Sequence, residues 1–114
     1  LAAQRARRQW QARALRALSE TDVLITPALP FPPTKLGSDT IEVAGQTVNP
    51  RGALGHFTQP FSCIGLPAMV IPLMGDGALP RAVQLVAHPW REDMLFEAAQ
   101  RLADSGLASS RILP

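Results

Sequence analysis

The sequence predicts an α/β fold, in which short apolar strands form a sheet and a helix from each end of the chain packs on it. Two observations carry this prediction. Helical periodicity covers residues 2–18 and 92–103, and three compact apolar runs lie between them, at residues 23–26, 68–73 and 82–87. A chain of 114 residues suffices for one hydrophobic core, so we expect a single segment with no second domain.

The first helix is predicted by alanine-rich periodicity. Its repeated residues recur at three- and four-residue spacing, which places them on one helical face: Ala3, Ala6, Trp10, Ala14 and Ala17. No capping residue precedes this pattern at Leu1. We therefore expect the chain to be a piece of a longer protein.

The second helix has the end signals that suit the helix macrodipole. Glu92 and Asp93 occupy its first turn, Arg101 lies near its end, and Gly106 follows. Its apolar face is predicted to consist of Met94, Leu95, Ala98 and Leu102.

The strands are predicted by their residue types and by the prolines that bound them. The run at 23–26 is rich in β-branched residues and stops at Pro27, after which three further prolines make an extended loop. The run at 68–73 is apolar at every position, so we expect it to be buried on both faces. The run at 82–87 contains one polar residue, Gln84, at its centre.

The region between these runs is less regular. Residues 27–57 are predicted to be a loop that contains a hairpin, with Ala44 and Gly45 as its two turn residues. Residues 57–64 mix aromatic, polar and small side chains without a clean period, so their structure is left open.

Composition excludes several classes of protein. A hydrophobic fraction of 46% with 18% charged residues indicates a packed globular chain, and the longest apolar stretch, residues 63–75, is interrupted by two prolines and is too short to span a membrane. The single cysteine, Cys63, cannot form an internal disulfide, which favours a cytoplasmic location. The net charge is only +2, so the pI near 9.5 does not by itself indicate nucleic acid.

The residues that hydrolytic chemistry needs are not found in their usual settings. No serine lies in a Gly-x-Ser-x-Gly elbow or a Ser-x-x-Lys pair, and the only lysine, Lys35, lies in the proline-rich loop. Cys63 with His56 or His88 could form a thiolate pair, but a small buried cysteine and hydrogen-bonded histidines are the favoured interpretation.

Ligand sites of other kinds are also not expected. Two histidines 32 positions apart, with Glu92 and Asp93 near one of them, lack the spacing of a metal site. The arginines of residues 2–18 spread around the helix, which favours a solvated outer helix and makes nucleic-acid binding unlikely: Arg5, Arg7, Arg8, Arg13 and Arg16.

Three local patterns, in order along the chain, resemble the C-terminal third of the amidase signature family of serine hydrolases. The first is Asp-Val-Leu-Ile-Thr-Pro-Ala-Leu-Pro at residues 22–30, and the second is Phe-Thr-Gln-Pro-Phe at 57–61 with Gly-Leu-Pro-Ala at 65–68. The third is Leu-Pro at 79–80 with Val-Gln-Leu-Val at 83–86, followed by the acidic start of the second helix. Ser62 and Ala82 depart from the family's usual asparagine and glycine.

The resemblance implies an α/β/α fold with a mixed central sheet flanked by helices, incomplete in this chain. It implies a parent enzyme that hydrolyses carbon–nitrogen amide bonds through a serine acyl-enzyme without a cofactor. The family's catalytic lysine and serines precede the matched part, so no catalytic, cofactor or metal residue is assigned here. The chain alone is expected to be inactive, while Thr58 and Phe61 are expected to form part of the substrate pocket.

The expected partners are the N-terminal part of the same enzyme, a small-molecule amide and a second copy in a homodimer, without membrane or nucleic acid. Three alternatives stay open. One is a stand-alone interaction domain, another is a piece of the A component of a tRNA-dependent amidotransferase, and the third is a self-sufficient hydrolase that uses Cys63 or Ser62 with a histidine.

Overall fold

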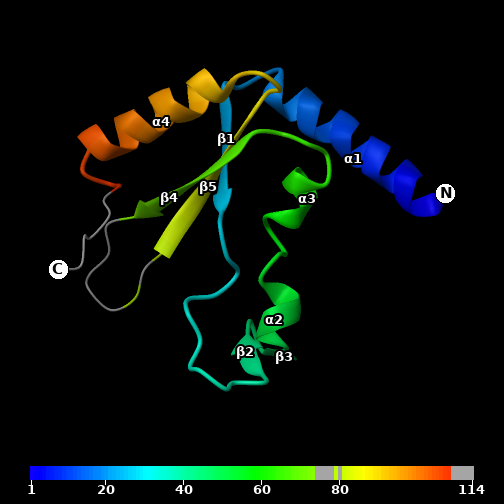
Figure 1. Ribbon diagram of the computed structural model, residues 1–114, viewed down its shortest axis with the longest axis vertical. Coiled ribbons are helices and arrows are strands. Elements are labelled where there is room, and N and C mark those ends of the chain that lie inside the picture. Colours follow the sequence, from blue (N-terminus) through cyan, green and yellow to red (C-terminus); the bar gives the residue numbers. More distant parts are fainter. Residues whose placement is uncertain (74–78, 80, 109–114) are drawn as a thin grey trace.

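The protein is a three-stranded sheet with a helix on each side and a small hairpin unit set apart from it (Figure 1). The computed structural model describes residues 1–73, 79 and 81–108. Its α-helices and strands are, in chain order, α1 (Ala2–Leu18), β1 (Val23–Pro27), β2 (Ile41–Val43), β3 (Gln46–Val48), α2 (Pro50–Ala53), α3 (Gln59–Ser62), β4 (Ala68–Leu73), β5 (Arg81–Ala87) and α4 (Glu92–Asp104). The predicted α/β class is confirmed.

The sheet has the order β1-β5-β4, and both neighbouring pairs are antiparallel. Val86 lies opposite Leu24 of β1 on one side and opposite Ala68 of β4 on the other. The parallel pairs of a mixed sheet are therefore not found among the described strands. β1 extends one residue further than predicted, to Pro27, which an edge strand tolerates because a proline there need not donate to a ladder.

Two apolar cores lie on opposite faces of the sheet, because side chains alternate along β5. On one face Val86 packs with Ala14 and Leu18 of α1 and with Phe61 of α3. On the other face, Leu85 and Ala87 pack with Leu95 of α4 and with Ile71 of β4. The chain therefore folds into three layers, α1, the sheet and α4. Residues 84–87 of β5 are buried between the two helices.

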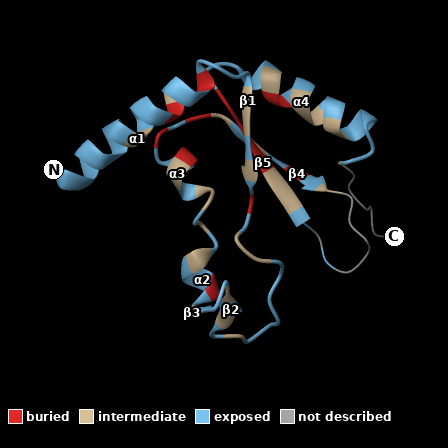
Figure 2. Cartoon of the chain, turned by 180° about the vertical axis from the view of Figure 1, so that it is seen from behind, coloured by how far each residue is buried: buried red, intermediate tan, exposed pale blue. Residues whose placement is uncertain are grey.

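The prediction that residues 68–73 are buried on both faces is wrong within this chain. Val70 is 55% exposed, and Ala68 and Pro72 are also exposed, whereas Ile71 is buried (Figure 2). The cause is the position of the strand. β4 is at the edge of the sheet, α4 covers one of its faces, and the core of α1 and α3 on the opposite face gathers around Val86.

The hairpin and the one-turn helix α2 lie below the sheet in Figure 1, whereas the one-turn helix α3 lies beside the sheet, under α1. Ala44 and Gly45 both have positive φ, at 50° and 76°, which is the geometry of a two-residue hairpin turn of type I′. Asn49 caps α2, since its side-chain oxygen accepts a hydrogen bond from the Gly52 backbone nitrogen at 3.2 Å. α3 occupies the region 57–64 that the sequence left open. Among the described residues, no helix has the length and apolarity needed to cross a membrane.

Candidate functional site

Gln84 is the buried polar side chain at the centre of the described sheet, and it connects three segments. It is 2% exposed, and its Nε2 atom donates hydrogen bonds to Thr26 Oγ1 and to the Phe57 carbonyl oxygen, each at 3.2 Å. An unpaired buried amide costs several times what a typical hydrogen bond contributes, so a fully apolar strand does not accept glutamine unless partners exist. The amide therefore ties the loop before α3 to β1 and β5.

Thr58, one of the two predicted pocket residues, follows directly after the carbonyl that Gln84 holds. It is half-buried and stands at the N-cap of α3, although its side chain makes no capping hydrogen bond. Its own carbonyl accepts the backbone N–H groups of Phe61 and Ser62, at 3.2 and 3.1 Å. The position of Thr58 is thus set by hydrogen bonds on both sides, while its hydroxyl remains outside the capping network.

Phe61, the other predicted pocket residue, lies in the core. It is 7% exposed and packs against Trp10 of α1, with ring centroids 5.7 Å apart and planes at 58°. The Trp10 Nε1 atom donates to the Pro60 carbonyl at 2.6 Å, which fixes α1 against α3. Thr58 and Phe61 therefore lie on the same one-turn helix segment, and the Phe61 ring faces α1. Their part in substrate binding stays a prediction.

The side chains that could make a self-sufficient nucleophile are held by backbone carbonyls. Ser62 Oγ donates to the Thr58 carbonyl at 3.1 Å, and Cys63 Sγ donates to the Pro60 carbonyl at 3.2 Å. His56 makes an edge contact with Phe57, and His88 Nδ1 lies 3.4 Å from the Pro89 carbonyl. In the described part of the chain no histidine is hydrogen-bonded to a serine or cysteine, which nucleophile activation requires. Cys63 is exposed and not buried as the sequence suggested.

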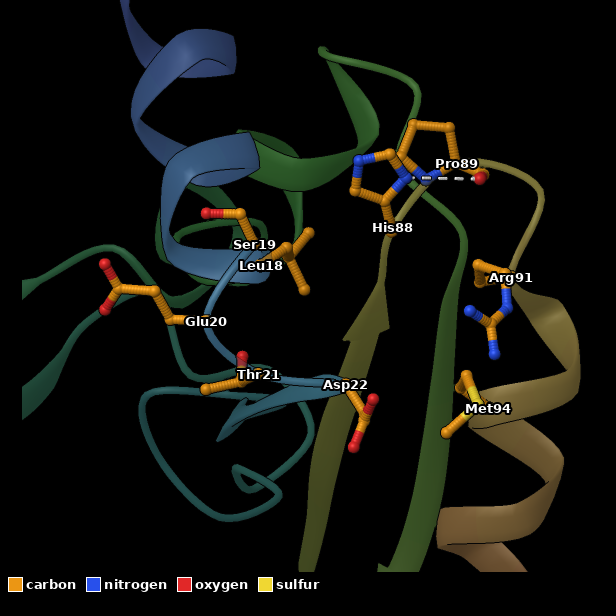
Figure 3. A pocket seen from close by; sticks show the side chains of 9 residues that line it. All are labelled: Leu18, Ser19, Glu20, Thr21, Asp22, His88, Pro89, Arg91 and Met94. Carbon is orange, nitrogen blue, oxygen red and sulfur yellow. Dashed lines mark hydrogen bonds between the residues drawn. The ribbon is translucent and has the colours of Figure 1, made fainter.

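A hollow of about 510 Å³ opens beyond the end of β5 (Figure 3). Its walls come from the end of α1, the turn into β1 and the turn into α4: Leu18, Ser19, Glu20, Thr21, Asp22, His88, Pro89, Arg91 and Met94. Neither predicted pocket residue lines it. No group of three or more metal-ligating side chains occurs among residues 1–73, 79 and 81–108, so the hollow has no described metal site.

Arg91, the arginine that lines this hollow, is partly neutralised by Asp93 two positions along the chain. Arg91 Nε donates to Asp93 Oδ1 at 2.9 Å, and its Nη2 donates to the second carboxylate oxygen at 3.1 Å. The hydrogen bond from Arg91 lowers the pKa of Asp93 below its ordinary value, and the same bond raises the pKa of Arg91. The pair lies at the start of α4, and because both side chains are exposed it adds little to stability.

Sequence reasoning marked Gln84 as polar but did not identify its partners. The available signal was a single amide in an otherwise apolar strand. Its partners, Thr26 and Phe57, are 58 and 27 positions away, so only the fold shows which groups it joins.

A family model and several known proteins match most of the chain. The family model described as Amidase matches residues 1–96. The AtzE subunit of the 1-carboxybiuret hydrolase of Pseudomonas sp. (strain ADP) is 38% identical over 95% of this chain. The A component of the glutamyl-tRNA(Gln) amidotransferase of Pelodictyon phaeoclathratiforme is 34% identical over 90% of it.

The solved structures agree in fold. A structure described as a vestigial protein complex that reveals the evolutionary origins of an s-triazine catabolic enzyme covers 98% of this chain with a TM-score of 0.90 and 35% identity. The chain spans about a quarter of the length of that protein and 24% of the AtzE protein. These comparisons do not favour a stand-alone interaction domain. Since the family model matches most of its residues, the chain belongs to the amidase signature family.

Proposed function

We propose that this chain is the C-terminal part of an amidase that hydrolyses a carbon–nitrogen amide bond through a serine acyl-enzyme. The observation that carries the proposal is the Amidase family match over residues 1–96, in a chain only about a quarter as long as its relatives. The three motifs from which the resemblance was inferred all lie within or beside this matched range. In the proposed parent, the catalytic lysine and serines belong to the part of the polypeptide that precedes the chain.

The proposal makes this chain inactive by itself. A serine or cysteine nucleophile needs an adjacent base and donors for the oxyanion that develops at the carbonyl. Ser62 and Cys63 instead donate to the carbonyls one turn before them, and His56 is in edge contact with Phe57. Each of these side chains makes a contact with a nearby part of the chain, which supports a structural role for all three.

In the proposed parent, the segment around Thr58 forms part of the wall of the acyl pocket. Support comes from the way the segment is held. Gln84 of β5 donates a hydrogen bond to the Phe57 carbonyl, and Trp10 of α1 donates one to the Pro60 carbonyl. A pocket wall must keep its shape while substrates exchange, and positions held by second-layer hydrogen bonds meet that need. Phe61 contributes by filling the core behind the wall.

The proposed substrate is a small-molecule amide, and the proposed reaction uses no cofactor. A relative named as part of a 1-carboxybiuret hydrolase supports a compact amide substrate. The proposed partner is the rest of the same enzyme, which would cover the open sheet face at Val70 and the exposed Ile25 on β1. A homodimer and a cytoplasmic location, the latter suggested by the single cysteine, belong to the same proposal.

Turnover measurements on the purified chain test this assignment. We expect no hydrolysis of a simple amide such as hexanamide above the buffer rate, and the same null result with His56→Ala and His88→Ala. A complete polypeptide that contains this chain should hydrolyse the amide. Turnover by the chain alone that either histidine substitution abolishes would support the self-sufficient hydrolase instead.

A further inference from the structure

The charge of the molecule is concentrated on α1. Residues 1–19 contain five arginines and neither aspartate nor glutamate, which leaves six cationic against nine acidic residues in the rest of the chain. The net charge of +2 therefore conceals a helix of charge +5 attached to a body of charge −3. Such asymmetry within a small protein indicates a surface for a negatively charged partner.

The fold shows which side of α1 points away from the core of the described residues. Ala14 and Leu18 are 2% and 4% exposed and face the core. At 3.6 residues per turn, Arg5 and Arg16 differ by only about 20° in direction and point almost directly away from those two residues. Arg8 and Arg13 flank them within an arc of about 140°. The sequence suggested arginines spread around the helix, but without the core direction it could not show that four of the five share the outward half.

The first half of α1 contacts little of the described chain. Residues 1–9 are all exposed, and Figure 1 shows this part of the helix extending away from the sheet. The four outward arginines, Arg5, Arg8, Arg13 and Arg16, are defined here as the arginine face. They span eleven positions, or about 16 Å along the helix axis.

The guanidinium groups of these arginines have no hydrogen-bond or ion-pair partner among residues 1–73, 79 and 81–108, although the backbone of Arg16 accepts a hydrogen bond from Ser19 Oγ. The two described arginines of the α4 region are paired, Arg91 with Asp93 and Arg101 with Glu97, at 2.9 and 2.6 Å. The arginine face is also unfavourable for the helix that carries it. No acidic residue stands in the first turn of α1, Arg5 opposes the helix dipole there, and Arg5 and Arg8 are like charges three positions apart. Each arrangement costs a few tenths of a kcal/mol, which a bound polyanion would offset.

The outward half of α1 carries alanine and glutamine beside its arginines, and no aromatic or large aliphatic residue. Protein interfaces are built around aromatic and apolar anchors, and membrane-surface helices need a free apolar face. Interfaces with nucleic acid are more polar and far more positive. Arginine also presents a planar fork that matches phosphate oxygens in pairs. We propose that the arginine face of α1 docks on the phosphate backbone of a nucleic-acid duplex, without reading its sequence.

Fluorescence anisotropy with a labelled 20-base-pair DNA duplex of mixed sequence tests the proposal on the full chain. Each phosphate neutralised contributes about −0.9 to the slope of log K against log of the salt concentration, so four contacts give a slope of roughly −3 to −4. Affinity should then fall on the order of 100-fold between 50 and 200 mM KCl. A duplex of different sequence should bind equally well.

The decisive variant is R5A/R8A/R13A/R16A, which should abolish the salt-dependent binding while alanine preserves the helix. Its matched control, R5K/R8K/R13K/R16K, should keep the slope, and Lys35→Ala should leave affinity unchanged. Circular dichroism verifies that each variant retains the wild-type helix content. Unchanged binding by the alanine variant would overturn the proposal, as would binding of poly-L-glutamate as tightly as the duplex, which would assign the face to an acidic protein.

A second measurement uses only the wild-type chain. Arginine modification by p-hydroxyphenylglyoxal, mapped by mass spectrometry, should be suppressed by the duplex at the arginine face and unchanged at Arg51. Protection at Arg51 without protection of the arginine face would contradict the proposed docking surface.

Discussion

Gln84 and Thr26 lie opposite each other in neighbouring strands, and the amide of the first donates a hydrogen bond to the hydroxyl of the second at 3.2 Å. The same amide reaches the Phe57 carbonyl, so one side chain joins the middle strand, an edge strand and the loop that leads to Thr58. Through these two hydrogen bonds, the Gln84 amide connects the sheet to the segment that forms the proposed pocket wall.

Replacing Gln84 by leucine should lower the free energy of unfolding by about 1–3 kcal/mol, because the Phe57 carbonyl loses a donor inside the fold. Urea unfolding followed by circular dichroism measures the change. Gln100→Leu is the matched control. Gln100 is exposed, and its side chain donates a hydrogen bond to Asp104 on the same helix, so its loss should cost less than about 0.5 kcal/mol. Equal changes in the free energy of unfolding for the two substitutions would show that the Gln84 amide does not hold the Phe57 carbonyl to the sheet.

Phe61→Ala should destabilise the chain by about 3–5 kcal/mol, since it removes a buried ring from the core between α1 and the sheet. Phe96, which is 65% exposed on α4, provides the control with the same chemical change. Phe96→Ala should cost less than about 1 kcal/mol. A small effect of Phe61→Ala in the same denaturation experiment would place Phe61 outside the core.

Trp90→Gly should be more stable than Trp90→Ala by roughly 1 kcal/mol, because Trp90 has a φ of +65° and only glycine adopts that region without strain. The strain arises in a tight turn in which the Arg91 backbone nitrogen donates to the His88 carbonyl at 3.0 Å, with Pro89 at the second position. Thermal unfolding of the two variants measures the difference. Equal melting temperatures would mean that the turn relaxes when the ring is removed.

The ion pair at the start of α4 predicts a pH dependence with a defined sign. Arg91 lowers the pKa of Asp93, so the stabilisation by this pair is present above the ordinary value of 3.8 and is lost as the pH falls through the lowered pKa. An NMR titration of the Asp93 carboxyl carbon should give a higher pKa in Arg91→Ala than in the wild type. An unchanged pKa would show that the two side chains are not paired in solution.

The isolated chain should bind a hydrophobic dye and self-associate, because Val70 and Ile25 are 55% and 60% exposed on a sheet with two open edges. Light scattering with dye binding measures both properties. Val70→Thr with Ile25→Thr should reduce the association, whereas Leu36→Thr in the long loop should have little effect. A monomer that binds no dye would contradict the proposal that another part of a larger enzyme covers Val70 and Ile25, which lie on opposite faces of the sheet.

Local signals in the sequence were sufficient to predict the two long helices and the strands of the three-stranded sheet. Periodicity in α1 and α4 and the β-branched run of β1 are properties of neighbouring residues, and the fold uses them as predicted. The exposure of Val70 could not be predicted, because it depends on which face of β4 the helices cover. α3 was too short for a helical period to appear.

The candidate site was predictable only in part. Resemblance to the family pointed to Thr58 and Phe61, but it did not show that Phe61 packs on Trp10 or that Gln84 holds the Phe57 carbonyl. These contacts join residues 27 to 51 positions apart and depend on tertiary packing. The outward direction of Arg5 and Arg16 became visible only when the fold showed where α1 meets its core.

The central claim is that this chain belongs to an amidase whose nucleophile lies outside it. Trapping the acyl-enzyme on a complete polypeptide that contains the chain, followed by peptide mass spectrometry, tests that claim most directly. We predict that the acyl group is found on a serine outside residues 1–114 and that the chain alone forms no adduct. An acyl group on Ser62 or Cys63 would contradict the account.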